Sequence, residues 1–447
     1  MNARPSRSLL IALLSSSFLT GWCLIAVGEK PCDYVAEGGA SVSEVFELPA
    51  ISLKSAQNAL LPQSIQNDRG ILLGGLSDLW RSSRDPAGEY WVITDRGPNA
   101  KVTVDGKKRR TFPVPEFTPL LLQVRANDGK LELLKTIPLL CTDRSPVTGV
   151  SNQPASDGVA YDFSARKNIP PNPNGLDTEG LVRAPNGDFW AAEEYRPSLI
   201  KISPQGVVQR RYVPAGVSLE GTGYPVSAVL PEVYTRRQDN LGFEGLAISS
   251  DGRTLYAPMQ SALSAEDVPE DTPSRNVRIL AFDIESEKPV AEYLYQFDEA
   301  PLVVAKEGEE PEPAELKIGA AVALPNSKLL VLERIDSTAK IYLVDLAQGT
   351  NLLNSDWHAA TSPSLESITD FQTAKVVPQP KTLVVDLATI PDMPDKLEGM
   401  ALVDQDTIAV VNDNDFGFED FDEEGNAVQK DSAKSRMYYI KLPKPLK

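Results

Sequence analysis

A short motif recurs five times along this sequence and constrains its fold more than any other feature. In each copy a glycine stands beside apolar residues, a turn follows, and an apolar run then ends on a polar or acidic residue. The copies run from Gly75 to Asp95, Gly180 to Glu194, Gly245 to Gln260, Gly319 to Glu333 and Gly399 to Asp413. Three of these intervals are 14 residues long, and the longest contains an extra turn at 81–88. A motif that recurs with nearly constant internal spacing indicates a repeat architecture.

Each copy has the composition of a β-hairpin. Turn-forming segments such as 185–188 and 250–253 separate apolar runs, and the runs that follow are rich in β-formers, as in 90–94. Further β-rich runs follow most copies, for example 340–344. Two hairpins in each repeated unit predict an all-β fold of the β-propeller kind with long acidic loops. A β-sandwich is the main alternative, but it gives no reason for the recurring acid.

The repeats also predict how many blades the propeller has and how it closes. Five blades are visible directly, and we expect six, with the sixth in 143–174 or near 383–387. The early strand 45–48 is expected to close the ring against the last blade.

The N-terminus predicts export from the cytoplasm. Arg4 and Arg7 precede an uncharged run from Ser8 to Gly28 that ends in small residues, which is typical of a secretory signal peptide cleaved after Gly28. Residues 29–447 would then form a single domain that is secreted or periplasmic. A retained N-terminal membrane anchor is the alternative. In an oxidising compartment Cys32 and Cys141 either form one disulfide or are unrelated thiols.

Charge and missing residue types narrow the chemistry. The formal net charge is −18, which disfavours nucleic acid and anionic membranes as partners, and we expect a monomer acting on small molecules. His358 is the single histidine, so a zinc site with several histidines is excluded. The sequence contains no Gly-x-Ser-x-Gly, P-loop or Gly-x-Gly-x-x-Gly motif. An enzyme of this composition must work with carboxylates, a hard cation and arginine or lysine.

The acids of the repeat fall at two positions. Glu179, Glu244 and Glu398 share one, and Asp95, Glu194, Glu333 and Asp413 share the other, where Gln260 is neutral. Equivalent residues of different blades converge on the propeller axis. Crowded carboxylates repel one another, and hard oxygen ligands suit Ca²⁺. We therefore expect calcium at Asp95, Glu179, Glu244, Glu398 and Asp413. Alternatively, each acid caps its own turn or pairs with Arg96, Arg196 or Arg334.

Five phrases stand together in this chain: 74–78, 94–99, 177–181, 243–246 and 397–401. In this order, across 72–442, they resemble the phytase-like family described by esterase-like activity. The resemblance implies a secreted propeller hydrolase, akin in architecture to calcium-dependent propeller phytases. It extends to the matching residues Asp95, Arg96, Glu179, Glu194, Glu244, Glu333 and Glu398. The chain departs from an acidic pattern at Gln260 and at Ile318, which puts a complete metal ring in doubt.

Two functions remain open from the sequence. In the first, the chain hydrolyses a phosphate or carboxylic ester: bound Ca²⁺ orients water, Arg96 and Arg334 hold the anion, and Glu194 or Glu333 is the general base. A sugar-lactone hydrolase is a narrower variant of this enzyme class. In the second, the chain is a non-catalytic binding propeller with structural calcium.

Overall fold

The computed structural model describes residues 39–446 apart from 62–63, 153–156, 270–271, 300–311, 360–361, 423 and 431–432. The expected signal peptide or anchor, its cleavage site and Cys32 lie outside the described residues. Cys141 is buried and forms no disulfide with any described residue. None of the helices in the described part of the chain is long and apolar enough to cross a membrane.

The structure is built from five antiparallel units of four strands each, ordered from the innermost strand outward. The first unit is β2 (Leu76–Trp80), β3 (Glu89–Thr94), β6 (Leu120–Asn127) and β7 (Lys130–Pro138). The second is β9 (Thr178–Arg183), β10 (Phe189–Glu193), β11 (Ser198–Ile202) and β12 (Val208–Pro214), to which β13 (Val226–Leu230) adds a parallel edge. The third is β14 (Ala247–Ile248), β15 (Thr254–Pro258), β16 (Asn276–Asp283) and β17 (Lys288–Gln296).

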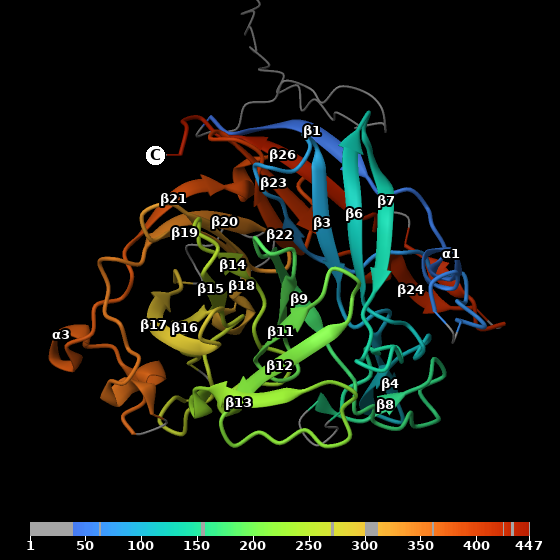
Figure 1. Cartoon of the computed structure of the whole chain (residues 1–447), viewed down its shortest axis with the longest axis horizontal. Coiled ribbons are helices and arrows are strands. Elements are labelled where there is room, and N and C mark those ends of the chain that lie inside the picture. The colour runs from blue at the N-terminus through green and yellow to red at the C-terminus, as the bar shows by residue number, and fades with distance from the viewer. Residues whose placement is uncertain are drawn as a thin grey trace, which may run out of the picture.

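The fourth unit is β18 (Lys317–Leu324), β19 (Lys328–Arg334), β20 (Ala339–Asp345) and β21 (Lys381–Asp386). The fifth is β22 (Leu397–Leu402), β23 (Thr407–Asn412), β26 (Arg436–Lys441) and β1 (Ser41–Glu47). The innermost strands contact one another in a closed circle, β2–β9–β14–β18–β22–β2. Figure 1 shows the five units following one another around the molecule. The chain is therefore a β-propeller, as the repeat predicts.

Smaller elements decorate these blades. They are α1 (Leu53–Gln57), α3 (Phe371–Ala374), the hairpins β4–β5 (Ala100–Val104 and Lys107–Thr111) and β24–β25 (Phe418–Phe421 and Ala427–Gln429), and β8 (Ala160–Tyr161). Single 3₁₀ turns are η1 (Glu232–Arg236), η3 (Pro313–Glu315), η4 (Asp356–His358), η5 (Leu365–Ser367), η6 (Leu387–Thr389) and η7 (Asp415–Gly417). The β4–β5 hairpin is inserted between two strands of the first blade.

The expected sixth blade is not found among the described residues. The segment 383–387 falls largely in β21, the outermost strand of the fourth blade. The described part of 143–174 contains only β8, which pairs with β5 rather than with a blade. Both segments are strand-like in sequence, but one completes the blade of another repeat and the other joins an inserted hairpin.

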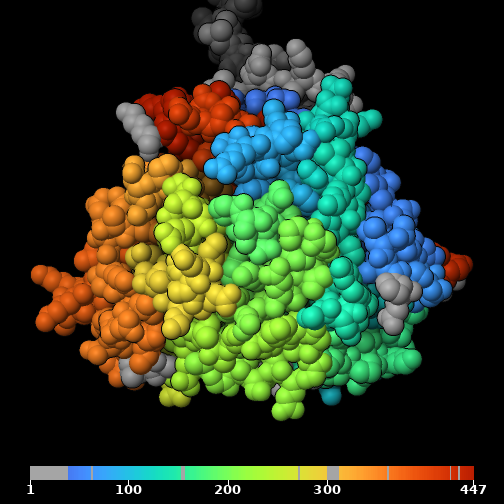
Figure 2. Space-filling model, viewed as in Figure 1, coloured from blue at the N-terminus to red at the C-terminus, as the bar shows by residue number. Residues whose placement is uncertain are grey.

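The predicted closing strand is confirmed. β1 pairs antiparallel with β26 from Ser41–Lys441 to Glu47–Arg436. The fifth blade is therefore made from both ends of the described chain, an arrangement that locks a ring without further covalent links. Figure 2 shows the N-terminal residues of β1 adjoining the C-terminal residues on the surface.

The recurring glycine has a packing cause. A Cβ at Gly180 would lie 2.5 Å from the backbone N of Leu246 in the next blade, and one at Gly245 would lie 2.9 Å from the carbonyl carbon of Ala320. Gly399 is equally close to the backbone of Asp78 in the first blade. Innermost strands at this separation leave no room for a side chain, so only glycine fits.

Candidate functional site

Strand pairing defines two equivalent positions in every blade, near the propeller axis. The second-strand position follows the second strand and contains Asp95, Glu194, Gln260, Arg334 and Asp413. These residues pair with Gly75, Asp177, Gly242, Lys317 and Lys396 on the chain leading into the first strand. The first-strand position lies two residues further along, at Ser77, Glu179, Glu244, Gly319 and Glu398. Nine of these ten residues have polar or charged side chains, and Gly319 is the exception.

The register corrects one predicted site residue, Glu333. Ile318 pairs with Glu333 and Lys317 pairs with Arg334, so Arg334 is the equivalent of Glu194. The prediction counted residues from the glycine of each copy. In the fourth blade that glycine, Gly319, occupies the position that Glu398 has in the fifth blade, and not the position of Gly399. A count along the sequence cannot show which residue of a bulged strand is the extra one.

Glu333 belongs to a separate network between the third and fourth blades. Its carboxylate accepts hydrogen bonds from the Tyr295 hydroxyl at 2.6 Å, from Lys381 Nζ at 2.7 Å and from the backbone N–H of Asp298 at 2.9 Å. Both oxygens of the Glu333 carboxylate therefore accept hydrogen bonds from protein groups. The structure therefore gives Glu333 a part in joining two blades and does not bring it to the other predicted acids.

Five buried carboxylates converge into what we call the acidic cluster: Asp177, Glu179, Glu194, Glu244 and Glu398. They form two groups of three, each with one oxygen per residue lying within 4.8 Å of the others. Glu179 belongs to both groups. Three of the predicted acids, Glu179, Glu244 and Glu398, form one of these groups.

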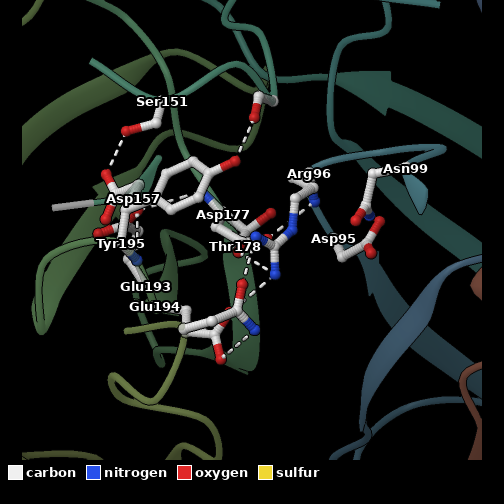
Figure 3. A network of polar contacts seen from close by, with 12 residues as sticks. Asp95, Arg96, Asn99, Ser151, Asp157, Asp177, Thr178, Glu193, Glu194 and Tyr195 are labelled. Atoms are coloured by element: carbon white, nitrogen blue, oxygen red, sulfur yellow. Dashed lines mark hydrogen bonds and ion pairs between the residues drawn. The ribbon is translucent and has the colours of Figure 1, made fainter. Parts of the chain in front are cut away.

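Arg96 pairs with one side of the acidic cluster. Its Nη2 lies 2.7 Å from Asp177 Oδ2 and 2.8 Å from Glu194 Oε2. Asn240 completes the network, because it accepts a hydrogen bond from Arg96 Nη1 at 2.6 Å and donates one to Glu194 Oε1 at 3.2 Å. Figure 3 shows this network, with Arg96 reaching across to Asp177 and Glu194. Both oxygens of Glu194 are therefore held in fixed directions.

Arg334 pairs with the other side of the acidic cluster. Its guanidinium makes an ion pair with Glu398 and lies 3.5 Å from Glu244 Oε1. It also bonds the more exposed Asp336 at 3.0 Å. The predicted alternative, in which the acids pair with arginines, is thus confirmed for Arg96 and Arg334.

The acidic cluster keeps an excess of negative charge. Five carboxylates face two guanidinium groups. Burial raises the pKa of Glu179 well above its usual value, and Asp177 and Glu244 raise it further. Burial and Glu398 likewise raise the pKa of Glu244 to about 7, although Arg334 opposes the shift. Without another cation, some of these acids must take up protons.

Several oxygens of the site have no partner among the described residues. Glu244 Oε2 and Gln260 Oε1 are buried without a hydrogen bond. Glu179 makes no hydrogen bond or ion pair with any described side chain. Unsatisfied buried oxygens are costly unless a ligand completes them. An all-oxygen donor set of this charge fits a hard cation such as Ca²⁺.

Two predicted metal ligands, Asp95 and Asp413, lie outside both groups. Each carboxylate accepts the backbone N–H two residues further on, Gly97 at 2.7 Å and Asp415 at 2.9 Å. Burial raises the pKa of both acids, and each is repelled by neighbouring carboxylates. They border the acidic cluster and add to its negative field.

The family model described as "Phytase-like: Esterase-like activity of phytase" matches residues 71–416, which contain the acidic cluster and both of its arginines. The chain belongs to this phytase-like family. It is similar to an uncharacterised secreted protein of Arthroderma benhamiae, at 28% identity over 323 residues, which are 62% of this chain and 62% of that protein's own length.

Solved structures with similar folds share little sequence with this phytase-like chain. The periplasmic gluconolactonase of Pseudomonas aeruginosa has 13% identity and a TM-score of 0.32, covering 83% of this chain and 90% of its own. The aldose sugar dehydrogenase of Streptomyces coelicolor in its PQQ-bound form has 11% identity and a TM-score of 0.33, covering 91% and 99%.

Sequence reasoning missed three residues of the site. Asp177 stands two residues before Glu179, and alternate residues of a strand point to one face, so this signal was available. Asn240 comes from a loop, and nothing near it in the sequence marks it. Glu193 accepts the backbone N–H groups of Asp177 at 3.1 Å and Tyr195 at 3.2 Å, and so fixes the turn that carries Glu194.

Proposed function

We propose that this chain is a secreted, calcium-dependent hydrolase of phosphate or carboxylic esters that acts on small molecules as a monomer. The observation that carries the proposal is Glu179, which two groups of acids share and which has no cationic partner among the described residues. The family's description supports hydrolysis of esters. The N-terminal sequence and the secreted relative support export.

The acidic cluster would hold the cation. When bound, calcium supplies a positive charge that polarises a phosphoryl or carbonyl oxygen and favours ionised water. Arg334 balances Glu244 and Glu398, so we assign it a part in holding the cluster together rather than in touching substrate.

Glu194 is the proposed general base. Arg96 and Asn240 fix both of its oxygens, which prepares one direction for accepting a proton from water. Burial raises its pKa while Arg96 opposes the rise, and a carboxylate with a raised pKa is a better base near neutral pH. Arg96 then stabilises the negative charge that develops beside Glu194.

A binding propeller with structural calcium remains the second candidate. The observation that favours it is burial: the side chains of the acidic cluster are nearly inaccessible, and Glu179 is 5% exposed. A hydrolase needs an open ligand position for water, whereas a structural site is closed.

The deciding experiment measures turnover of p-nitrophenyl phosphate, p-nitrophenyl acetate and phytate by the purified secreted protein, in calcium and in chelator. We expect turnover that disappears in chelator and in Glu179→Gln. Glu333→Gln is the matched control, because it removes the same charge from an acid outside the cluster. Calcium-dependent thermal stability without turnover of any substrate would contradict the hydrolase and favour the binding propeller.

A further inference from the structure

A pocket of about 220 Å³ opens beside the acidic cluster. Phe112, Val150, Ile169 and Pro170 give it apolar walls, and Arg110 and Tyr195 are among its polar lining groups. The Tyr195 ring connects the pocket to the site, because its centroid lies 5.2 Å from the guanidinium carbon of Arg96. Figure 3 shows Tyr195 with Ser151 and Asp157 on one side and Arg96 on the other.

Arg110 is an uncompensated cation in this pocket. It lies on β5, and its Nη1 donates to Asn99 Oδ1 at 2.9 Å. It makes no ion pair with any carboxylate of the described residues, so most of its five donors are unused. Burial and the nearby Arg96 lower the pKa of Arg110, while Tyr195, Glu194 and Asp177 oppose the shift.

The acid that lines the pocket does not offset this charge. Asp157 pairs with Arg237 and lies 3.1 Å from Arg196 Nη1. It also accepts a hydrogen bond from Ser151. Because these two guanidinium groups already hold Asp157, its charge is not available to neutralise Arg110. The pocket therefore attracts anions although the whole chain carries a net charge of −18.

We propose that this pocket binds a small ligand with an apolar body and one anionic group, which Arg110 holds. Arginine binds phosphate and carboxylate groups through paired hydrogen bonds, and apolar walls with few polar groups are typical of small-molecule sites. The further statement that this ligand is the substrate rests on the proposed hydrolase function, whereas the binding itself does not.

The test is a calorimetric titration of the secreted protein with phenylphosphonate, whose phosphorus–carbon bond resists hydrolysis. We expect binding in chelator as well as in calcium, and weaker binding of methylphosphonate, which lacks the apolar ring. Arg110→Gln should weaken phenylphosphonate binding at least tenfold. Lys107→Gln is the matched control: it removes the same charge from an exposed residue of the same strand, and it should leave the affinity unchanged.

A second variant guards against misfolding of the first. Val159 lines the pocket and is 44% exposed, so Val159→Trp should fill the mouth and abolish binding while the melting temperature stays within a few degrees. Equal affinity in Arg110→Gln and the parent would overturn the proposal. So would binding that requires calcium, because the anion would then lie on the cation, and so would an absence of binding at millimolar concentration.

The outcomes separate this proposal from the proposed function. Arg110-dependent binding without ester turnover would support the proposed anion site in the pocket and contradict the hydrolase function. Ester turnover together with phenylphosphonate binding that does not depend on Arg110 would support the hydrolase and contradict the proposed anion site in the pocket.

Discussion

A Cβ at Gly319 would come 3.2 Å from Nε of Arg334, so the arginine side chain lies against the space that a side chain at Gly319 would need. In the second, third and fifth blades the same first-strand position carries Glu179, Glu244 or Glu398. The fourth blade therefore places a positive charge where three others place a negative one. In the fourth blade a glycine replaces the acid, and Arg334 occupies the space beside it. The positive charge of Arg334 explains how so many carboxylates fit around one axis.

Replacing Arg334 should destabilise the protein, because Arg334 offsets the repulsion between Glu244 and Glu398. Arg334→Gln leaves Glu244 and Glu398 buried without their counter-charge, and breaking a buried pair in this way costs about 3 kcal/mol of the free energy of unfolding. Calcium should restore part of the loss, because it supplies positive charge at the same carboxylates. Urea unfolding in chelator and in calcium measures both effects.

Arg253→Gln is the control for this comparison. Arg253 pairs with Glu285 on the surface, where both side chains are mostly exposed, and such pairs contribute less than about 1 kcal/mol. Equal destabilisation by the two substitutions would show that Arg334 does not balance a buried charge excess.

The metal-free protein should become more stable as the pH falls from about 8 towards 5. Burial and Glu398 raise the pKa of Glu244 to about 7, and burial raises the pKa of Glu179 as well. A group with a raised pKa in the folded state binds protons more tightly when folded. Its contribution is therefore fully present below the unfolded pKa and is lost as the pH rises through the folded pKa.

Melting temperatures across this pH range in chelator and in calcium measure the effect. Calcium should add most stability at the high-pH end, where the acids are ionised, and Glu244→Gln should flatten the slope in chelator. Stability of the metal-free protein that rises with pH over this interval would contradict the repulsion inferred for the acidic cluster.

Glu333→Gln should lower stability without changing calcium affinity. The substitution removes the charge that Lys381 pairs with at 2.7 Å and weakens the bond from the Tyr295 hydroxyl, which together cost about 1–3 kcal/mol. Because Glu333 lies outside the acidic cluster, calcium titration of the variant should match the parent. A loss of calcium affinity in this variant, if it is folded, would show that Glu333 is a ligand of the metal.

The sequence predicted the propeller and most of the acids because both depend on a repeated local pattern. Glycine recurs where innermost strands touch, as at Gly180, and the acids recur beside it. The error at Glu333 arose because the first strand of the fourth blade carries its glycine, Gly319, one residue earlier than the other repeats, at the position of Glu398. Asn240 and Arg110 reach their places through long loops and an inserted hairpin, and neither follows the repeat.

Closure of the ring should depend on Phe46. This buried residue of β1 stacks edge to face on Tyr439 of β26, with ring centroids 4.9 Å apart. The Tyr439 hydroxyl accepts a hydrogen bond from that of Tyr90 at 2.7 Å, and Tyr90 belongs to the first blade. Tyr439 therefore contacts both the closing strand and the first blade.

Phe46→Ala should lower the free energy of unfolding by about 3 kcal/mol, because it removes a buried ring and leaves a cavity. Tyr90→Phe should cost about 1 kcal/mol by removing one hydrogen bond. Since both residues contact Tyr439, their effects should be non-additive in the double variant. Val428→Ala, at an exposed position of β25, is the control and should change stability little. Strictly additive losses would mean that Phe46 and Tyr90 are not coupled through Tyr439.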